Sequence, residues 1–144
     1  MSPEQVPAER QDARQLWRRD ACALAHGITV EDAGDGHARL RMPVRPDMTN
    51  GHGICHGGII FLLADTALAY ASVAPGPTQT NVAASATITF TRPAHPGEVL
   101  LATCRRLHQQ GRSGLYDVQV TTQAGEPVAF FRGQVILTQR RGSE

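Results

Sequence analysis

The chain has 144 residues, of which 41% are hydrophobic and 19% charged, and its formal net charge is +1. This length fits one domain, and a near-neutral charge does not drive binding to nucleic acid or to an anionic membrane. The three cysteines are widely spaced and the first residues lack a continuous apolar stretch, so we expect a cytoplasmic protein without disulfides or a signal peptide.

The N-terminal part predicts a helix over residues 3–25, which Gly27 could end, and then two short strands over 28–30 and 38–44. The turn-rich residues 33–36 join these strands into a hairpin. We expect residues 1–144 to form a single domain, with residues 1–25 as an N-terminal helical extension.

A longer helix is predicted from residue 59 to about residue 73, after a glycine-rich and polar stretch at 46–58. This helix is apolar on every side, which is typical of a helix in the middle of a core. The residues at 75–77, Pro-Gly-Pro, are expected to end it.

Four strands are predicted in the remainder, over 81–91, 99–107, 115–122 and 128–138, with short connections between them. Alternation in the first of these places five apolar side chains on one face: Val82, Ala84, Ala86, Ile88 and Phe90. One buried helix followed by consecutive strands indicates an α+β fold with an antiparallel sheet around the helix.

Asp65 is the only formally charged side chain from residue 57 through residue 91. It falls in the middle of the apolar helix, where an unpaired carboxylate is costly to bury or has a raised pKa. Two interpretations remain open. In the first, the carboxylate takes part in a reaction. In the second, it has no role in a reaction and either makes a satisfied buried hydrogen bond or faces a solvent gap.

Gly57 and Gly58 precede this helix and could present backbone N–H groups to a developing oxyanion, although an ordinary flexible loop is the alternative. Gly57 and Asp65 lie about 12 Å apart along one helix, so they cannot both touch one carbonyl carbon. If both act on the same carbonyl group, they come from two protomers with antiparallel helices. This mechanism predicts at least a dimer.

Polar residues in the preceding loop are further candidates. His56 could hydrogen-bond an acyl oxygen or orient the loop, or it is a solvated histidine. Asn50 could position a water or the carbonyl group, or form an Asx turn. Cys55 is expected to be an inert apolar side chain. His52, Cys55 and His56 lack a second ligand pair at structural-zinc spacing, so we predict no metal site.

The run from Asn50 to Thr66, NGHGICHGGIIFLLADT, resembles the signature of hotdog-fold thioesterases of the phenylacetate-degradation (PaaI) type. The resemblance continues with Arg92-Pro93, with HQQGRSGLYD at 108–117 and with AFFRG at 129–133, so it covers roughly residues 46–133. It implies a hotdog fold, in which an antiparallel sheet wraps around a long central helix. Such proteins pair into dimers and usually into tetramers.

The resemblance also implies roles for individual residues. Asp65 would act as general base or nucleophile, the Gly57 N–H would polarise the thioester carbonyl, and His56 and Asn50 match supporting positions.

Substrate contacts are expected from four further residues. Thr66 matches a residue that hydrogen-bonds near the carboxylate, and Gly58 would also meet the substrate. We add that Arg112 or Arg92 could contact CoA phosphate oxygens.

The resemblance implies a cytoplasmic enzyme that hydrolyses phenylacetyl-CoA or hydroxyphenylacetyl-CoA to the free acid and CoA, although related hotdog thioesterases take medium-chain or benzoyl-type acyl groups. No cofactor is expected, and the predicted partners are the acyl-CoA substrate and further copies of the chain. Two alternatives stay open: a hotdog hydratase or dehydratase, whose Asp-x-Asn-Pro-x-His pattern is absent, and a non-enzymatic acyl-CoA-binding module.

Overall fold

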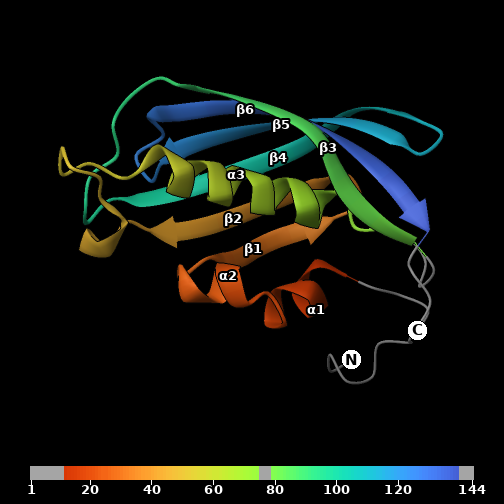
Figure 1. Ribbon diagram of the computed structural model, residues 1–144, viewed down its shortest axis with the longest axis horizontal. Coiled ribbons are helices and arrows are strands. Elements are labelled where there is room, and N and C mark those ends of the chain that lie inside the picture. Colours follow the sequence, from red (N-terminus) through yellow and green to blue (C-terminus); the bar gives the residue numbers. More distant parts are fainter. Residues whose placement is uncertain (1–11, 75–78, 140–144) are drawn as a thin grey trace.

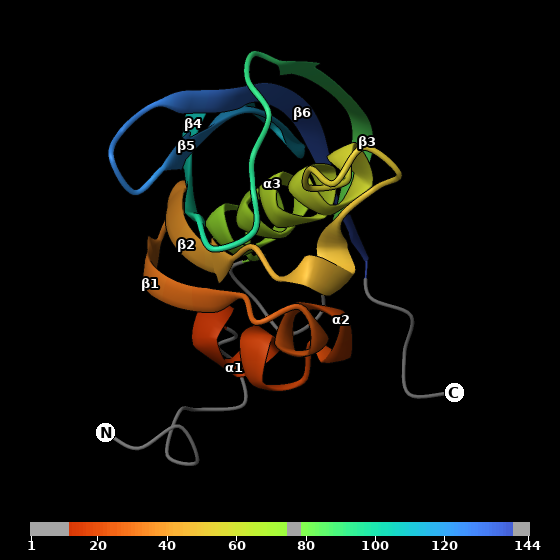
Figure 2. The ribbon, with the colours of Figure 1, turned by 90° about the vertical axis from the view of Figure 1, so that its left-hand side faces the viewer.

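The computed structural model describes residues 12–74 and 79–139, whose strands form one antiparallel sheet in the order β1-β2-β4-β5-β6-β3. The sheet curves around the long helix α3, with the short helices α1 and α2 outside it near β1 (Figure 1, Figure 2). The strands are β1 Thr29–Gly34, β2 His37–Pro43, β3 Gln79–Phe90, β4 Val99–Gln110, β5 Ser113–Thr122 and β6 Pro127–Gln139. The helices are α1 Ala13–Arg18, α2 Ala21–Ala25, the 3-10 turn η2 Pro46–Met48 and α3 Gly57–Ala71. The α+β hotdog architecture predicted from the sequence is confirmed.

Helix α3 forms close to where the sequence predicted it, but it begins at Gly57 instead of Ile59 because the side chain of His56 caps its first turn. Its interior holds no proline and is rich in Ala and Leu, which favour helix. The predicted terminator at 75–77 lies outside the described residues. No helix in the described part of the chain is long and apolar enough to cross a membrane.

The burial of α3 is uneven, unlike the prediction of a helix enclosed on every side. Leu63, Ala64 and Leu68 are fully buried against the sheet. A single curved sheet covers only part of a helix surface, however, and one stripe of α3 remains half-buried or exposed. This open stripe follows helical spacing and consists of Gly58, Leu62, Asp65 and Ala69.

A β-bulge between Ala83 and Ser85 interrupts the predicted alternation of β3. One extra residue in a strand exchanges its two faces. Val82 therefore points away from α3 and is 48% exposed, whereas Ile88 and Phe90 keep the side that faces α3. The prediction that Val82 shares their face was wrong.

The N-terminal region forms two short helices instead of the one helix predicted over 3–25, of which residues 1–11 lie outside the described part. The break falls at Asp20, whose carboxylate caps α2 by accepting the Ala23 N–H at 3.0 Å. The other carboxylate oxygen accepts the hydroxyl of Tyr70 at 2.5 Å, which ties α2 to the end of α3. Asp20 thus favours a new helix start over continuation of the first helix.

Candidate active site

Asp65 is a half-buried carboxylate on the open stripe of α3. Among residues 12–74 and 79–139, none donates a hydrogen bond to it or forms an ion pair with it. Burial raises the pKa of Asp65 above its ordinary value, since no cation opposes the effect. The hydroxyl of Thr66 donates to the Leu62 carbonyl at 2.7 Å and does not contact the carboxylate. The single chain therefore leaves Asp65 free to accept a proton.

The first turn of α3 leaves one backbone N–H without an acceptor. The Gly58 N–H donates to His56 Nδ1 at 2.9 Å, and the N–H groups of Ile59 and Ile60 donate to the His56 carbonyl. The Gly57 N–H has no acceptor within the described residues. A free N–H at a helix N-terminus suits an oxyanion. The two predicted glycines therefore differ, because the Gly58 N–H already donates to His56, whereas the Gly57 N–H has no acceptor among the described residues.

His56 orients the first turn of α3, which is one of the roles that the sequence left open. Its Nδ1 accepts a hydrogen bond, so the proton of the neutral imidazole is on Nε2. The ring folds back over Gly58, where an added Cβ would lie 3.0 Å from Nδ1. His56 therefore orients the helix start, and its Nε2–H has no acceptor among the described residues.

Asn50 forms the Asx turn that the sequence allowed. Its Oδ1 accepts the His52 N–H at 2.9 Å, and its carbonyl accepts the Gly53 N–H at 3.0 Å. The Nδ2 group of Asn50 has no acceptor in the described part of the chain. The side chain is thus held in place by one atom and retains a second polar group for a substrate.

Cys55 is buried, and burial raises the pKa of its thiol to about 11. The thiol is therefore protonated at neutral pH, in agreement with the interpretation of an inert side chain. The residues that the structure describes contain no group of three His, Cys, Asp or Glu side chains suited to hold a metal ion.

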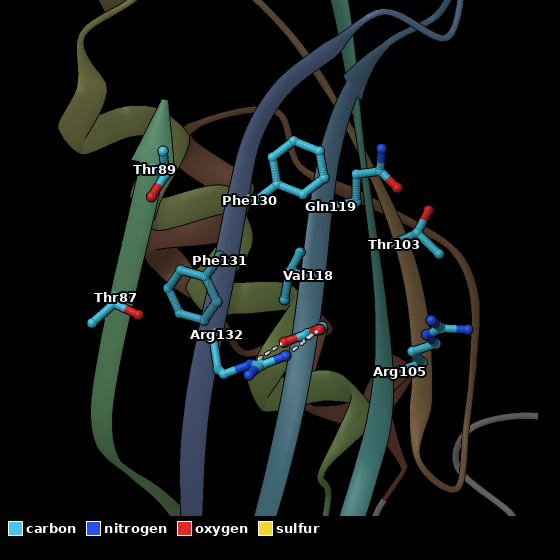
Figure 3. A pocket seen from close by; sticks show the side chains of 10 residues that line it. Thr87, Thr89, Thr103, Arg105, Val118, Gln119, Phe130, Phe131 and Arg132 are labelled. Carbon is cyan, nitrogen blue, oxygen red and sulfur yellow. Dashed lines mark hydrogen bonds and ion pairs between the residues drawn. The ribbon is translucent and has the colours of Figure 1, made fainter. Parts of the chain in front are cut away.

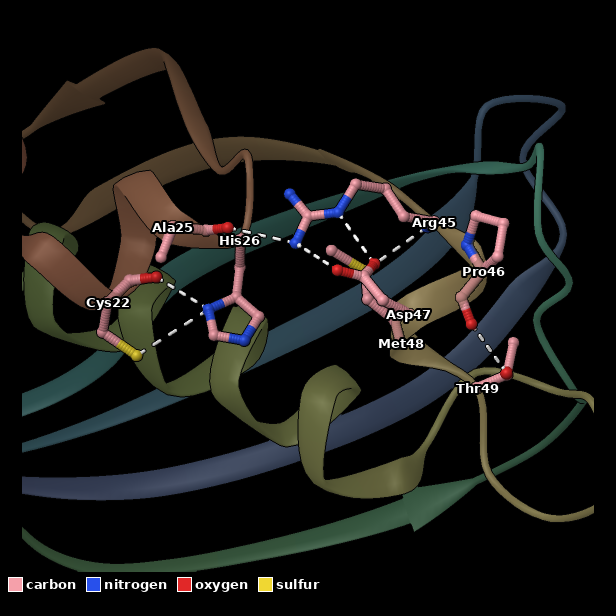
Figure 4. Close-up of polar contacts among 8 residues, drawn as sticks. All are labelled: Cys22, Ala25, His26, Arg45, Pro46, Asp47, Met48 and Thr49. Atoms are coloured by element: carbon pink, nitrogen blue, oxygen red, sulfur yellow. Dashed lines mark hydrogen bonds and ion pairs between the residues drawn. The ribbon is translucent and has the colours of Figure 1, made fainter.

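Polar contacts of Arg45 hold in place the segment that precedes the loop before α3 (Figure 4). Its guanidinium donates to the Ala25 carbonyl at 3.1 Å and to the Asp47 carboxylate at 3.0 Å. The hydrogen bond from Arg45 lowers the pKa of Asp47. One residue further on, the Met48 carbonyl accepts the His56 N–H at 2.8 Å. A continuous set of contacts therefore runs from α2 to the residue that caps α3.

The two arginines proposed for phosphate contacts differ in their surroundings. Arg92 forms ion pairs with Glu98 at 3.2 Å and with Glu126 at 3.6 Å, so its guanidinium is already engaged. Arg112 lies exposed in the turn between β4 and β5, where its carbonyl accepts the Leu137 N–H at 2.8 Å. Of the two, Arg112 has the freer side chain.

The predicted groups do not all meet within one chain. His56, Gly57 and Gly58 form one cluster at the start of α3. Asp65 lies eight residues after Gly57 on the same helix, which corresponds to about 12 Å along the axis. A carbonyl group bound at the Gly57 N–H is therefore out of reach of the same chain's carboxylate.

A separate hollow of about 740 Å³ lies on the outer face of the sheet, away from α3 (Figure 3). It contains the pair between Arg132 and Asp117, joined at 2.6 and 2.9 Å, with Arg105 nearby. The hydrogen bond from Arg132 lowers the pKa of Asp117. None of the predicted site residues lines this hollow. Sequence reasoning missed it because outward-facing threonines such as Thr87 and Thr89 are typical of an ordinary solvent face.

Phe90 is a neighbour of the site that sequence reasoning did not assign to it. An added Cβ on Gly57 would lie 3.1 Å from Cζ of this ring. The alternation of β3 placed Phe90 on the inward face, but no local pattern related it to a residue more than thirty positions earlier.

Comparison with known proteins gives consistent matches. Residues 52–129 match the family model described as the thioesterase superfamily. The chain is 43% identical over 124 residues to "Acyl-coenzyme A thioesterase PaaI" of Escherichia coli K12, covering 86% of this chain and 87% of that protein.

Solved structures show the same relationship. The E. coli PaaI structure superposes with a TM-score of 0.83 at 41% identity, covering 89% of this chain and 91% of that one. A Streptococcus mutans UA159 protein bound to acetyl CoA superposes with a TM-score of 0.72 at 25% identity, covering 79% and 90%.

Proposed function

Because this chain belongs to the thioesterase superfamily, as an acyl-CoA thioesterase of the PaaI type, we propose that it hydrolyses aryl-acetyl-CoA thioesters. The proposed substrates are phenylacetyl-CoA and hydroxyphenylacetyl-CoA, and the products are the free acid and CoA. Support for this acyl class comes from the relative's place in a phenylacetic acid degradation operon. The free cysteines Cys22, Cys55 and Cys104 agree with a reducing cytoplasm as the site of the reaction.

The reaction assigns one task to each polar group. The Gly57 N–H, with His56 Nε2–H, stabilises the oxygen of the thioester carbonyl as it becomes negative. In one route Asp65 takes a proton from water while the water oxygen adds to the carbonyl carbon; the C–S bond then breaks, and the CoA sulfur takes that proton from Asp65. In the other route Asp65 itself attacks the carbonyl carbon, and the C–S bond breaks to leave a mixed anhydride. Water then hydrolyses this anhydride, which releases the free acid, restores the Asp65 carboxylate and supplies the proton for the CoA sulfur. A carboxylate whose pKa is raised by burial is a stronger base than an exposed one.

The observation that carries the proposal is the pair of unpartnered groups on α3, the Asp65 carboxylate and the Gly57 N–H. They have no partner among the residues that the structure describes, and they are separated by about 12 Å along the helix. Two α3 helices antiparallel across a two-fold axis bring the carboxylate of one protomer to the N–H of the other. We therefore propose that the active unit is at least a dimer, and that dimers pair into a tetramer.

Two surfaces support dimer formation. The open stripe of α3 exposes Leu62 and Ala69 beside Asp65, and burial of that apolar surface favours association. Strand β3 lies at the edge of the sheet with β6 as its neighbour, so its other edge can pair with a second chain. Strand β3 also lies beside the start of α3, because its last residue, Phe90, lies against Gly57.

We expect release of CoA thiol from phenylacetyl-CoA and hydroxyphenylacetyl-CoA with a higher kcat/KM than from alkyl acyl-CoAs such as hexanoyl-CoA. A thiol-reactive dye measures the rate for each member of the panel. Equal rates for aryl and alkyl thioesters would contradict the proposed acyl class. Hydration of an enoyl-CoA without CoA release, or tight binding without turnover, would contradict hydrolysis itself.

A further inference from the structure

Phe90 is a large apolar side chain with an open face on the inner side of the sheet. It is the last residue of β3 and lies opposite Ala129 of β6, on the side that faces α3. Side chains on this side of β4, β5 and β6 are mostly buried, whereas those of the edge strand β3 are half-buried or exposed, and Phe90 is the largest of them at 49% exposed. An exposed phenylalanine on the core side of a sheet indicates that something else covers it.

The ring of Phe90 lies directly against Gly57. A Cβ added to Gly57 would be 3.1 Å from Cζ and 3.5 and 3.6 Å from the two Cε atoms, so the tip of the ring points at the Gly57 backbone. Gly57 is the residue whose N–H has no acceptor among the described residues. A carbonyl group bound there therefore has the Phe90 ring beside it.

The neighbouring aromatic rings are already paired. Phe61, one helical turn after Gly57, contacts Phe131 edge to face, with ring centroids 5.3 Å apart. Phe131 pairs across the strands with Ile88, two residues before Phe90. Within residues 12–74 and 79–139, no ring contact involves Phe90. The inner face thus offers a fixed aromatic pair and, next to Gly57, one ring with a free face.

We infer that Phe90 is a specificity residue, whose free ring face stacks on the aryl group of the acyl chain while the thioester carbonyl is held at Gly57. This inference rests on the proposed hydrolysis of aryl-acetyl-CoA. A flat aromatic acyl group gains an offset-stacked or edge-to-face contact with the ring, beyond the apolar area that it buries. A linear alkyl group buries area against Phe90 without this extra contact, so the ring favours aryl over alkyl substrates.

The test compares phenylacetyl-CoA with hexanoyl-CoA in three variants of Phe90. Phe90→Leu keeps an apolar side chain and removes the ring, and we expect kcat/KM for phenylacetyl-CoA to fall about three- to tenfold more than for hexanoyl-CoA. The loss should appear mainly in KM, since the contact is present in both the bound substrate and the transition state. Phe90→Tyr should retain the aryl preference, and Phe90→Met replaces the Leu variant if that variant fails to fold.

Phe130→Leu is the matched control, because Phe130 has a similar exposure of 47% on β6 and lines the hollow on the outer face. It should leave the ratio of aryl to alkyl rates unchanged. Equal losses for both thioesters in Phe90→Leu, or no loss, would overturn the inference. So would sedimentation of this variant as a monomer, because Phe90 would then be covered by a second protomer. Failure of the proposed function gives a different result, because the wild-type protein itself would then show no preference for the aryl thioester.

Discussion

Asp65→Asn is expected to lower kcat for phenylacetyl-CoA about a thousandfold, because an amide can neither take a proton from water nor attack the thioester. The substitution preserves the shape of the side chain on α3. Thiol release at saturating substrate measures the effect, and wild-type protein purified in parallel is the reference. A kcat within a few-fold of wild type would remove Asp65 from the proposed mechanism.

The same variant should be at least as stable as wild type at neutral pH. Burial raises the pKa of Asp65 in the folded state, so the cost of ionising the carboxylate grows as the pH rises above the ordinary aspartate pKa and is complete above the raised pKa. Asn carries no charge and avoids this cost. As the pH falls from the raised pKa to below the ordinary value, Asp65 is protonated in both the folded and the unfolded chain, and the stabilities of the two proteins should converge. Thermal unfolding at neutral and at acidic pH measures these stabilities. It also distinguishes a folded variant that lacks the carboxylate from one that is inactive because it is unfolded.

Gly57→Pro is expected to lower kcat about a hundredfold, because it removes the N–H that stabilises the oxyanion. Proline is tolerated at the first position of a helix, where the N–H has no intrahelical acceptor. The preceding residue, His56, has φ −60° and ψ 133°, which a following proline accepts. The fold should therefore survive, as circular dichroism can establish.

Gly57→Ala is the control for this substitution, because it keeps the N–H and adds only a methyl group. That methyl would lie 3.1 Å from Cζ of Phe90, at the far end of a side chain that can shift by a few tenths of an ångström. A smaller loss is therefore expected for Ala than for Pro. Similar losses in both variants would attribute the effect to crowding at Phe90 instead of the missing donor.

Much of the fold could be predicted because local patterns agree with the tertiary structure. The helix α3 and the C-terminal strands follow from apolar periodicity and from glycine and proline in the connections. The exceptions are positions where one residue changes a pattern. A bulge between Ala83 and Ser85 exchanges the faces of β3. Asp20 caps a second helix in a region where a single continuous helix was predicted.

The residues of the candidate site could be proposed from the sequence, but their surroundings could not. Asp65 is a candidate because it is a lone charge in an apolar helix, and Gly57 because a glycine at the helix start leaves the backbone open. The contact between Phe90 and Gly57 and the distinct states of the two glycine N–H groups depend on tertiary packing. Sequence periodicity describes one element at a time and does not contain such contacts.

The central claim, that each site takes Asp65 from one protomer and Gly57 from another, can be tested with mixed dimers of Asp65→Asn and Gly57→Pro chains. Differently tagged chains are coexpressed, and the heterodimer is purified. In a shared-site dimer one of the two sites then holds both intact groups, so we predict about half of the wild-type activity per dimer, well above either parent. Activity no higher than that of the parent variants would show that each site lies within a single chain, which contradicts the account.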